Sequence, residues 1–202
     1  MSEHYYTKNP ESAHEERTIR VNALGNELVF VTDAGVFSRD GLDRGTRVLL
    51  EALPVLSGRI LDLGCGWGAV GVALGAKYPD LEIVMTDVNC RAAALARRNA
   101  AANRVRAEVL EGDGFDAVSG RFDAIVTNPP IRAGKAVIYG LFDRAREFLS
   151  PGGTLYAVIR KQQGAPSALK HLETAYGRVE IIDRSAGYWV LAAGSRLITI
   201  SG

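Results

Sequence analysis

The sequence is short of cysteine and histidine, and it contains no long run of apolar residues. Two cysteines, Cys65 and Cys90, are too few for a disulfide framework or a cysteine-rich zinc site. The histidines His4, His14 and His171 are scattered, so we expect no metal site. Apolar runs stay well below the roughly 18 residues of a membrane helix, and the N-terminus lacks the profile of a signal peptide. Together these absences predict a reduced, cytoplasmic protein with no membrane partner.

The sequence also lacks an excess of positive or negative charge. The chain has 24 basic and 23 acidic side chains, a net charge of +1, so bulk electrostatics do not indicate a nucleic-acid binder. One stretch, residues 128–170, is locally basic, with two acidic side chains against these basic ones: Arg132, Lys135, Arg144, Arg146, Arg160, Lys161 and Lys170. Such a face can meet phosphate, although a set of solvated helix charges is the simpler interpretation of composition alone.

The length and composition are typical of one soluble globular domain. Its 202 residues suffice for a full hydrophobic core, and 47% apolar against 23% charged residues excludes a disordered tail, a fibre or a coiled coil. We expect a single domain over residues 1–202, with an N-terminal cap (1–57) on a core (58–202).

Residue patterns within the expected cap predict a hairpin and a helix. Residues 18–32 alternate apolar and polar side chains around Gly25 and Asn26, which is typical of a β-hairpin. A polar loop at 37–46 then leads into an apolar helix over 48–53, which Pro54 ends because its ring cannot continue the hydrogen-bond ladder.

From Arg59 onward, apolar strands alternate with helices. The predicted strands are 59–63, 81–86, 105–111, 122–127, 154–160, 178–183 and a final segment over 188–193 and 196–200. The predicted helices are 69–78, 89–103, 135–149 and 165–176. This alternation predicts an α/β fold, a mostly parallel seven-stranded sheet with helices on both faces. Because the last two strands follow each other without a helix, one of them should be antiparallel.

A glycine-rich turn lies where the first core strand meets the first core helix, in the sequence DLGCGWG (62–68). Ligands of open α/β sheets bind at such turns, where glycine lets the backbone approach closely. The spacing of Gly66, Gly68 and Gly71 also satisfies the dinucleotide fingerprint. However, Asp62 would repel a pyrophosphate, whereas it could meet an ammonium group. A tight turn without a ligand is the structural alternative.

Two further acids follow the next strands. Asp87 ends the second core strand and is placed to accept hydrogen bonds from both ribose hydroxyls of a nucleoside. Its alternative is to cap the following helix, as Asn89 could also do. Asp113 follows the third strand, where it either accepts from an adenine amino group or is an ordinary turn residue.

Asn128, Pro129 and Pro130 follow the fourth core strand directly. The two prolines stiffen the segment and remove backbone donors, so the Asn128 amide oxygen and the local carbonyls are presented as acceptors. Such acceptors suit a planar amino group, which has two N–H bonds to donate. A strand terminator could carry the same residues, but the preceding acids and glycines favour a site.

These motifs, in this order, resemble the class I S-adenosylmethionine-dependent methyltransferases. More narrowly, the chain is similar to the small-domain family that includes the ribosomal RNA guanine-N2 methyltransferases. The resemblance rests on FSRDGLDRGT (37–46), ILDLGCGWG (60–68), Asp87 and NPP (128–130), and it spans nearly the whole chain from about Tyr5. Residues 1–10 and 161–167 also look like compact single-domain bacterial members.

The resemblance implies a Rossmann-like methyltransferase fold that binds S-adenosylmethionine and releases S-adenosylhomocysteine. The implied catalytic residues are Asn128, Pro129 and Pro130. The implied cofactor-binding residues are Asp62, Gly64, Cys65, Gly66, Gly68, Asp87, Val88, Asp113 and Asn128. The implied substrate-binding residues are Phe37, Asp43, Ile131, Arg132 and Lys161. Many amino methyltransferases have an aromatic residue where this chain has Ile131, so Phe37 either supplies the ring or lies in the core.

The expected reaction is transfer of a methyl group to an exocyclic amino nitrogen, with guanine-N2 of ribosomal RNA as the favoured target. The expected partner is therefore ribosomal RNA or a ribosomal subunit. Methylation of adenine or of a protein glutamine uses the same chemistry, and the motif does not choose among them. A module of this fold that binds ribosomal RNA without catalysis is a further alternative. The sequence does not determine the oligomeric state.

Overall fold

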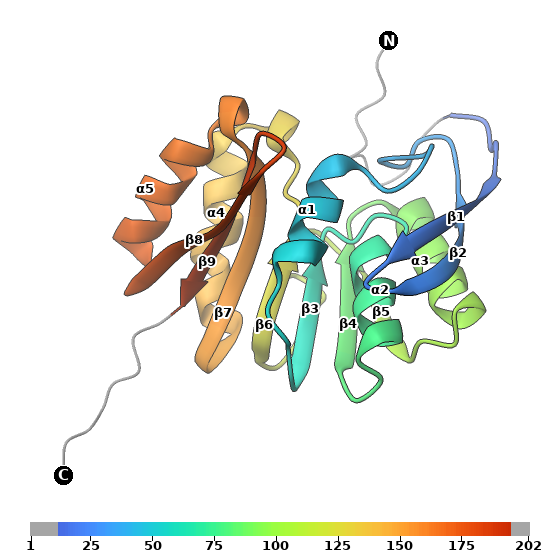
Figure 1. The fold of residues 1–202 in the computed structure, drawn as a ribbon, viewed down its shortest axis with the longest axis horizontal. Coiled ribbons are helices and arrows are strands. Elements are labelled where there is room, and N and C mark those ends of the chain that lie inside the picture. The colour runs from blue at the N-terminus through green and yellow to red at the C-terminus, as the bar shows by residue number, and fades with distance from the viewer. Residues whose placement is uncertain (1–11, 195–202) are drawn as a thin grey trace.

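A β-sheet runs through the middle of the molecule (Figure 1). The structure, a computed structural model, describes residues 12–194. Within those residues the sheet has seven strands in the order β5-β4-β3-β6-β7-β9-β8. Their bounds are β3 Arg59–Leu63, β4 Glu82–Asp87, β5 Ala107–Glu111, β6 Phe122–Thr127, β7 Leu149–Arg160, β8 Arg178–Ser185 and β9 Tyr188–Gly194. Residues 1–10 and the predicted segment 196–200 lie outside the described range.

The direction of the strands agrees with the prediction. β3 pairs in parallel with β4 and β6, while β4 with β5 and β6 with β7 are parallel as well. β9 is antiparallel to both of its neighbours, β7 and β8. The predicted mostly parallel sheet with an antiparallel strand near the C-terminus is therefore confirmed. The chain order reverses between β3 and β6, and ligands bind at such a point in open α/β sheets.

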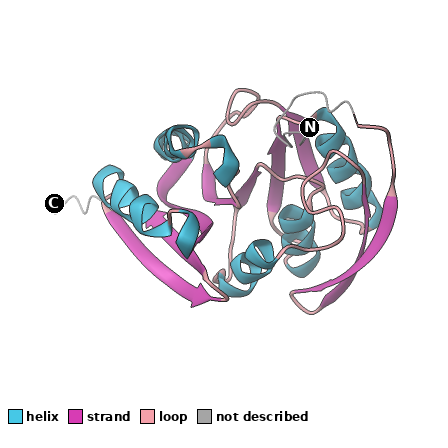
Figure 2. Ribbon diagram, turned by 90° about the horizontal axis from the view of Figure 1, so that it is seen from above, coloured by secondary structure: helices cyan, strands magenta, loops and turns pink. Residues whose placement is uncertain are grey.

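Helices cover both faces of this sheet, as the view from above illustrates (Figure 2). The helices are α1 Arg44–Ala52, α2 Ala69–Lys77, α3 Cys90–Ala102, α4 Lys135–Phe148 and α5 Ala165–Ala175, with short 3-10 turns at η1 Ile131–Ala133 and η2 Lys161–Gln163. Helices α1, α2 and α3 pack with one hydrophobic cluster, and α4 and α5 pack with the other. Each sheet face is thus buried by its own group of helices.

The N-terminal hairpin is joined to this core by asparagine side chains. Strands β1 (Arg17–Ala23) and β2 (Asn26–Thr32) meet at a two-residue turn, Leu24 and Gly25, in which both φ angles are positive. Asn99 of α3 and Asn103, which caps its C-terminus, each accept a hydrogen bond from a β2 backbone N–H and donate one to a β2 carbonyl. The free edge of β2 is therefore satisfied by a helix rather than by another strand.

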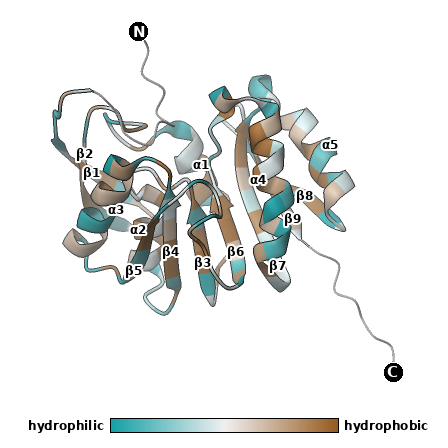
Figure 3. Cartoon of the chain, turned by 180° about the vertical axis from the view of Figure 1, so that it is seen from behind, coloured by the Kyte–Doolittle hydropathy of each residue, from teal (hydrophilic) through white to brown (hydrophobic). Residues whose placement is uncertain are grey.

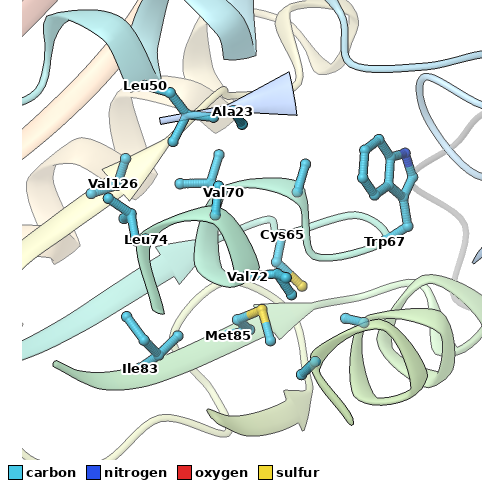
Figure 4. Packing of buried hydrophobic residues seen from close by; sticks show 14 of the residues in the cluster. Ala23, Leu50, Cys65, Trp67, Val70, Val72, Leu74, Ile83, Met85 and Val126 are labelled. Atoms are coloured by element: carbon cyan, nitrogen blue, oxygen red, sulfur yellow. The ribbon is translucent and has the colours of Figure 1, made fainter. Parts of the chain in front are cut away.

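The strands of the core are apolar on both faces. Along β4, Ile83 and Met85 point to the cluster of the first face, while Val84 between them points to the second. Figure 4 shows Met85 with Val70 of α2 and Leu50 of α1 in the first cluster. The central strands of the sheet are accordingly mostly hydrophobic (Figure 3). Burial on both faces explains why the strand segments lack a polar alternation.

Two predicted boundaries are wrong. Helix α1 begins at Arg44 rather than at residue 48, because the Asp43 carboxylate accepts from the N–H groups of Gly45 and Thr46 and caps the helix earlier. Residues 150–153, predicted as a turn between helix and strand, belong to β7. The pairing register of β6 and β7 shifts there, so the turn is present as an irregularity within a longer strand.

Candidate functional site

The main cleft of the described chain lies at the carboxyl edge of the sheet. Its volume is about 640 Å³, within the roughly 300–1,000 Å³ typical of ligand pockets. The loops that follow β3, β4, β5, β6 and the end of β7 all line it, because parallel strands deliver their carboxyl ends to one edge. The predicted site residues that line it are Phe37, Asp43, Asp62, Gly64, Cys65, Gly66, Asp87, Val88, Asp113, Asn128, Pro129, Pro130, Ile131 and Arg132.

The glycine turn after β3 is fastened to the end of β4. The backbone N–H groups of Gly64 and Cys65 both donate to the Thr86 carbonyl at 2.9 Å. The Gly66 N–H donates to the Asp87 carboxylate at 2.8 Å. Gly66 has a φ of +55°, and a Cβ there would meet nothing within 4 Å, so its surface faces open space. The turn therefore leaves room for a ligand beside it.

Gly68 has a structural role that the sequence did not predict. It caps α2 with a φ of +88°, and a Cβ at this position would lie 3.1 Å from the Cβ of Ala96 on α3. Gly68 is also not among the residues that line the cleft. Its glycine is required by backbone conformation and by the close approach of α2 to α3, and its cofactor contact stays a prediction.

Asp87 connects the glycine turn with the start of α3. One carboxylate oxygen accepts from Gly66 N, and the other accepts from Asn89 N at 2.9 Å. The cap of α3 is Asn89, whose side chain accepts from the N–H groups of Arg91 and Ala92. The alternative of Asp87 as the helix cap is therefore wrong. Burial raises the pKa of Asp87, while its backbone hydrogen bonds oppose that shift.

Asp62 lies deeper in the same cleft, with only 3% of its surface exposed. Its carboxylate accepts from the Gly71 N–H at 2.8 Å, in the first turn of α2. Burial, opposed by this hydrogen bond and aided by the charge of Asp87, raises the pKa of Asp62 to about 7. Two acids in one partly closed cleft make it electrostatically favourable for a cation.

Two other predicted cofactor-binding residues, Cys65 and Asp113, also line the cleft. Cys65 is buried in the wall of the cleft, and burial raises the pKa of its thiol well above the usual value, so the thiol stays protonated near neutral pH. Asp113 lines the cleft from the loop after β5 and is exposed, while its backbone carbonyl accepts from Asp116 N in a turn. The turn role and a ligand contact are therefore compatible.

Asn128 follows β6 and lines the cleft. Its Nδ2 group donates to Asp43 Oδ1 at 3.2 Å and to Thr46 Oγ1 at 3.0 Å. Its Oδ1 atom remains as an acceptor. Pro129 is buried and Pro130 half-buried, so the segment is held between the sheet and the cleft. Asp43, predicted to bind substrate, is in the structure the cap of α1 and a partner of Asn128.

Apolar side chains form part of the rim. Phe37 is 45% exposed and Val137 is 49% exposed, and both line the cleft together with half-buried Ile131. The alternative of Phe37 as a core residue is therefore wrong. Its backbone carbonyl accepts a hydrogen bond from the Trp67 indole at 3.0 Å, which fastens the 37–46 loop to the glycine turn.

Two basic side chains contribute to the lining of the cleft. Arg132 and Arg160 are exposed and line the cleft, whereas exposed Lys161 does not line it. The sequence motifs did not mark Thr46 or Tyr188 as site residues, and Arg160 was noted only as part of the basic stretch 128–170. Thr46 ends the 37–46 motif and Arg160 ends a predicted strand, so both carried a signal. Tyr188 begins β9, and nothing in its local sequence marks it.

Residues 12–194 show neither a metal cluster nor a membrane-spanning helix. These residues contain no cluster of three or more His, Cys, Asp or Glu side chains arranged for a metal ion. The helices of the same range are all too short or too polar to cross a membrane. The expected absence of a metal and the expected cytoplasmic location stay predictions.

Comparison with known proteins gives close relatives. A protein of Bacillus subtilis, the uncharacterized protein YbxB, is 38% identical over 96% of this chain and 98% of its own length. The ribosomal RNA small subunit methyltransferase C of Pseudomonas syringae is 36% identical over 88% of this chain and 54% of its own length. The chain thus spans about half the length of that second kind of relative.

A solved structure is similar as well. The Thermus thermophilus 16S rRNA N2 G1207 methyltransferase (RsmC), in complex with AdoMet and guanosine, superposes with a TM-score of 0.80 at 31% identity. The match covers 90% of this chain and 51% of that one. The family model for the methyltransferase small domain matches residues 27–192, which hold the glycine turn, both cleft acids and Asn128. The chain therefore belongs to the methyltransferase small domain family and has its Rossmann-like fold.

Proposed function

We propose that this protein transfers a methyl group from S-adenosylmethionine to the exocyclic amino nitrogen of guanine in ribosomal RNA. The observation that carries the proposal is the placement of Asn128 and Pro129 in the same cleft as the glycine turn, Asp62 and Asp87. A family whose members are methyltransferases supports the reaction type. The substrate is the finer part of the proposal, because the chain covers only about half of the relatives named for ribosomal RNA.

The cleft fits S-adenosylmethionine on three grounds. Its volume of about 640 Å³ accommodates a nucleoside with an amino-acid side arm. The open surface at Gly66 lets the backbone approach a ligand. Asp62 and Asp87 supply negative charge for a ligand that carries a sulfonium and an ammonium group. When bound, S-adenosylmethionine supplies a methyl group activated for nucleophilic attack by its positively charged sulfur.

The chain's own contribution would be to hold the amino nitrogen. A guanine amino group is a poor nucleophile because its lone pair is delocalised into the ring. Acceptance of its two N–H bonds by Asn128 Oδ1 and the Pro129 carbonyl would localise that lone pair and orient it. Positioning of two reactants at near-attack distance can contribute roughly 7–11 kcal/mol. A strong base is not needed, since the nitrogen loses a proton readily once it is methylated.

Several features support a nucleic-acid substrate. The similar Thermus thermophilus structure was solved with guanosine. Phe37 presents an exposed ring at the rim, where it can stack on a base that has left its helix. Arg132 and Arg160 lie at the mouth, where they can meet backbone phosphates. A flexible loop or a partly assembled subunit would be the easier target, because flipping a paired base costs a few kcal/mol.

The test is incubation of the protein with methyl-labelled S-adenosylmethionine and the RNA, ribosomal subunits and proteins of cells that lack the gene. We expect label in RNA, and nucleoside mass spectrometry should identify it as N2-methylguanosine. Label in adenine or in a protein glutamine would overturn the guanine assignment and establish one of the alternatives. Binding of S-adenosylhomocysteine without label in any fraction would overturn the enzymatic proposal and favour the non-catalytic module. The Asn128→Ala variant is the negative control.

A further inference from the structure

The Asn128 amide has two orientations of nearly equal shape, and only one of them suits the proposed reaction. Rotation by 180° exchanges Oδ1 and Nδ2 with almost no steric change. With Oδ1 toward the cleft, Asn128 accepts an N–H bond from the target amine. With Nδ2 toward the cleft, it would donate to a group that has only hydrogens to offer. Something in the protein must therefore select the orientation.

The neighbour that makes this selection is Asp43. Its Oδ1 atom accepts three hydrogen bonds, from Gly45 N at 2.9 Å, Thr46 N at 3.1 Å and Asn128 Nδ2 at 3.2 Å. An ionised carboxylate can accept hydrogen bonds but cannot donate them. A rotated amide would place two oxygens against each other at this point.

A second acceptor comes from the same helix turn. Thr46 is buried, with 5% of its surface exposed, and its Oγ1 atom accepts from Asn128 Nδ2 at 3.0 Å. The Asn128 amino group thus has two acceptors in the protein. Gly45 gives the carboxylate room, because a Cβ there would lie 3.1 Å from Asp43 Oδ1 and 3.0 Å from the Tyr188 ring. Asn128 is separated in the chain from Thr46 by 82 positions and from Asp43 by 85 positions.

We propose that Asp43 and Thr46 are positioning residues that fix the Asn128 amide with its oxygen toward the target amine. The proposal rests on the proposed function for the identity of that amine. It replaces the expectation that Asp43 binds substrate. The carboxylate adds a second effect, because its negative charge polarises the Asn128 amide and strengthens the opposite oxygen as an acceptor.

The orientation can be measured without any methyl transfer. The side-chain amide of Asn128 gives a pair of signals in an ¹⁵N correlation spectrum of the full chain, assigned by their loss in Asn128→Ala. We expect these signals to shift, and their hydrogens to exchange faster with water, in Thr46→Val and Asp43→Asn. Thr46→Ser keeps the hydroxyl and should keep the wild-type signals. Thr174→Val is the matched control, since the Thr174 hydroxyl bonds only locally, to the Lys170 carbonyl on α5.

Steady-state kinetics then separate positioning from a general structural role. We expect kcat to fall about 3- to 10-fold in Thr46→Val, as for the loss of one neutral hydrogen bond. For Asp43→Asn, which keeps a good helix cap, we expect a fall of about 10- to 100-fold, as for a charged one. KM for the RNA fraction, affinity for S-adenosylhomocysteine and thermal midpoint should stay near wild type. Thr46→Ser should recover most of the rate.

The outcomes distinguish this proposal from the proposed function. Unchanged Asn128 signals in both Thr46→Val and Asp43→Asn would overturn the positioning role, whatever the enzyme methylates. A fall in kcat matched by an equal loss of cofactor affinity or of thermal stability would also overturn it. If the Asn128 signals shift in the two variants but the wild-type protein methylates no RNA, the fixed amide is supported. Only the guanine assignment is then overturned.

Discussion

The Gly66 N–H donates to the Asp87 carboxylate at 2.8 Å, and this bond ties the turn after β3 to the end of β4. Asp87 also accepts from Asn89 N, so this one side chain holds both the turn after β3 and the turn after β4. A carboxylate already held by backbone donors needs little reorganisation when a ligand arrives. The structure thus presents Asp87 as a preorganised acceptor rather than as a loose surface acid.

Replacement of Asp87 by alanine should weaken cofactor binding. The variant loses a charged acceptor for the cofactor and a bond that holds the glycine turn. Hydrogen bonds to charged groups are worth about 1.5–3 kcal/mol, so affinity for S-adenosylhomocysteine should fall roughly 10- to 150-fold. Calorimetric titration measures it, with Asp80→Ala, an exposed acid in a distant turn, as the matched control. Equal affinities for the two variants would contradict a role for Asp87 in the cofactor site.

Asn128→Ala should abolish most methyl transfer while it leaves cofactor binding nearly unchanged. The removed amide contacts Asp43 and Thr46, and its oxygen is the proposed acceptor for the target amine. Loss of a positioned acceptor should lower the rate by about two to three orders of magnitude. Single-turnover transfer of labelled methyl to the RNA fraction gives the rate, and calorimetry with S-adenosylhomocysteine is the internal control. Near-normal turnover would refute a catalytic Asn128.

The pH dependence of stability should carry a contribution from Asp62. Its pKa in the folded chain is about 7, whereas an unfolded aspartate has a pKa of about 3.9. Between these values the folded chain holds a proton that the unfolded chain has lost. The resulting stabilisation is fully present below about pH 4 and is lost as the pH rises through about 7.

Asp62→Asn removes this titration and retains an oxygen that can accept from Gly71 N. Urea unfolding of both proteins at pH 5 and pH 8 measures the effect in the absence of ligand. The stability of the variant relative to wild type should be higher at pH 8 than at pH 5. The same difference at both pH values would show that the carboxyl titrates alike in the folded and unfolded chains.

Phe37→Ala should weaken RNA binding without loss of the fold. The ring is 45% exposed at the rim, while the contact with Trp67 is made by the backbone carbonyl and survives truncation of the side chain. Stacking of a base on an aromatic ring is worth about 1–3 kcal/mol, so KM for RNA should rise roughly 5- to 150-fold. Val55→Ala, exposed and outside the cleft, is the control. Equal KM values for both variants would exclude a stacking role.

Combined replacement of Arg132 and Arg160 by alanine should reduce the salt dependence of RNA binding. Both lie at the mouth of the cleft, where each is expected to meet one phosphate. For single strands, the slope of log affinity against log salt should lose about 1.4 for two contacts. The control is Lys77→Ala with Arg106→Ala, which removes the same charge at the opposite edge of the sheet. An equal loss of slope in the control would indicate nonspecific attraction only.

The sequence predicted the architecture and the place of the cleft because those depend on local patterns. Apolar strand segments, the glycine turn and Asn128 after a strand are all recognised within a few residues of the chain. Since parallel strands direct their carboxyl ends to one edge, the motifs that follow them had to gather there. The residues at these strand ends, Asp62, Asp87 and Asn128, are in the cleft as expected.

Only the tertiary structure decided how these residues are held. The bonds from Asn128 to Asp43 and Thr46 join segments more than eighty positions apart, which come together because α1 packs on β7 and β9 and β7 lies beside β6. The structure also showed that Gly68 serves the contact between α2 and α3. A local pattern identifies a residue as polar or flexible, but the choice of partner depends on strand order and helix packing, which bring distant residues within hydrogen-bonding distance.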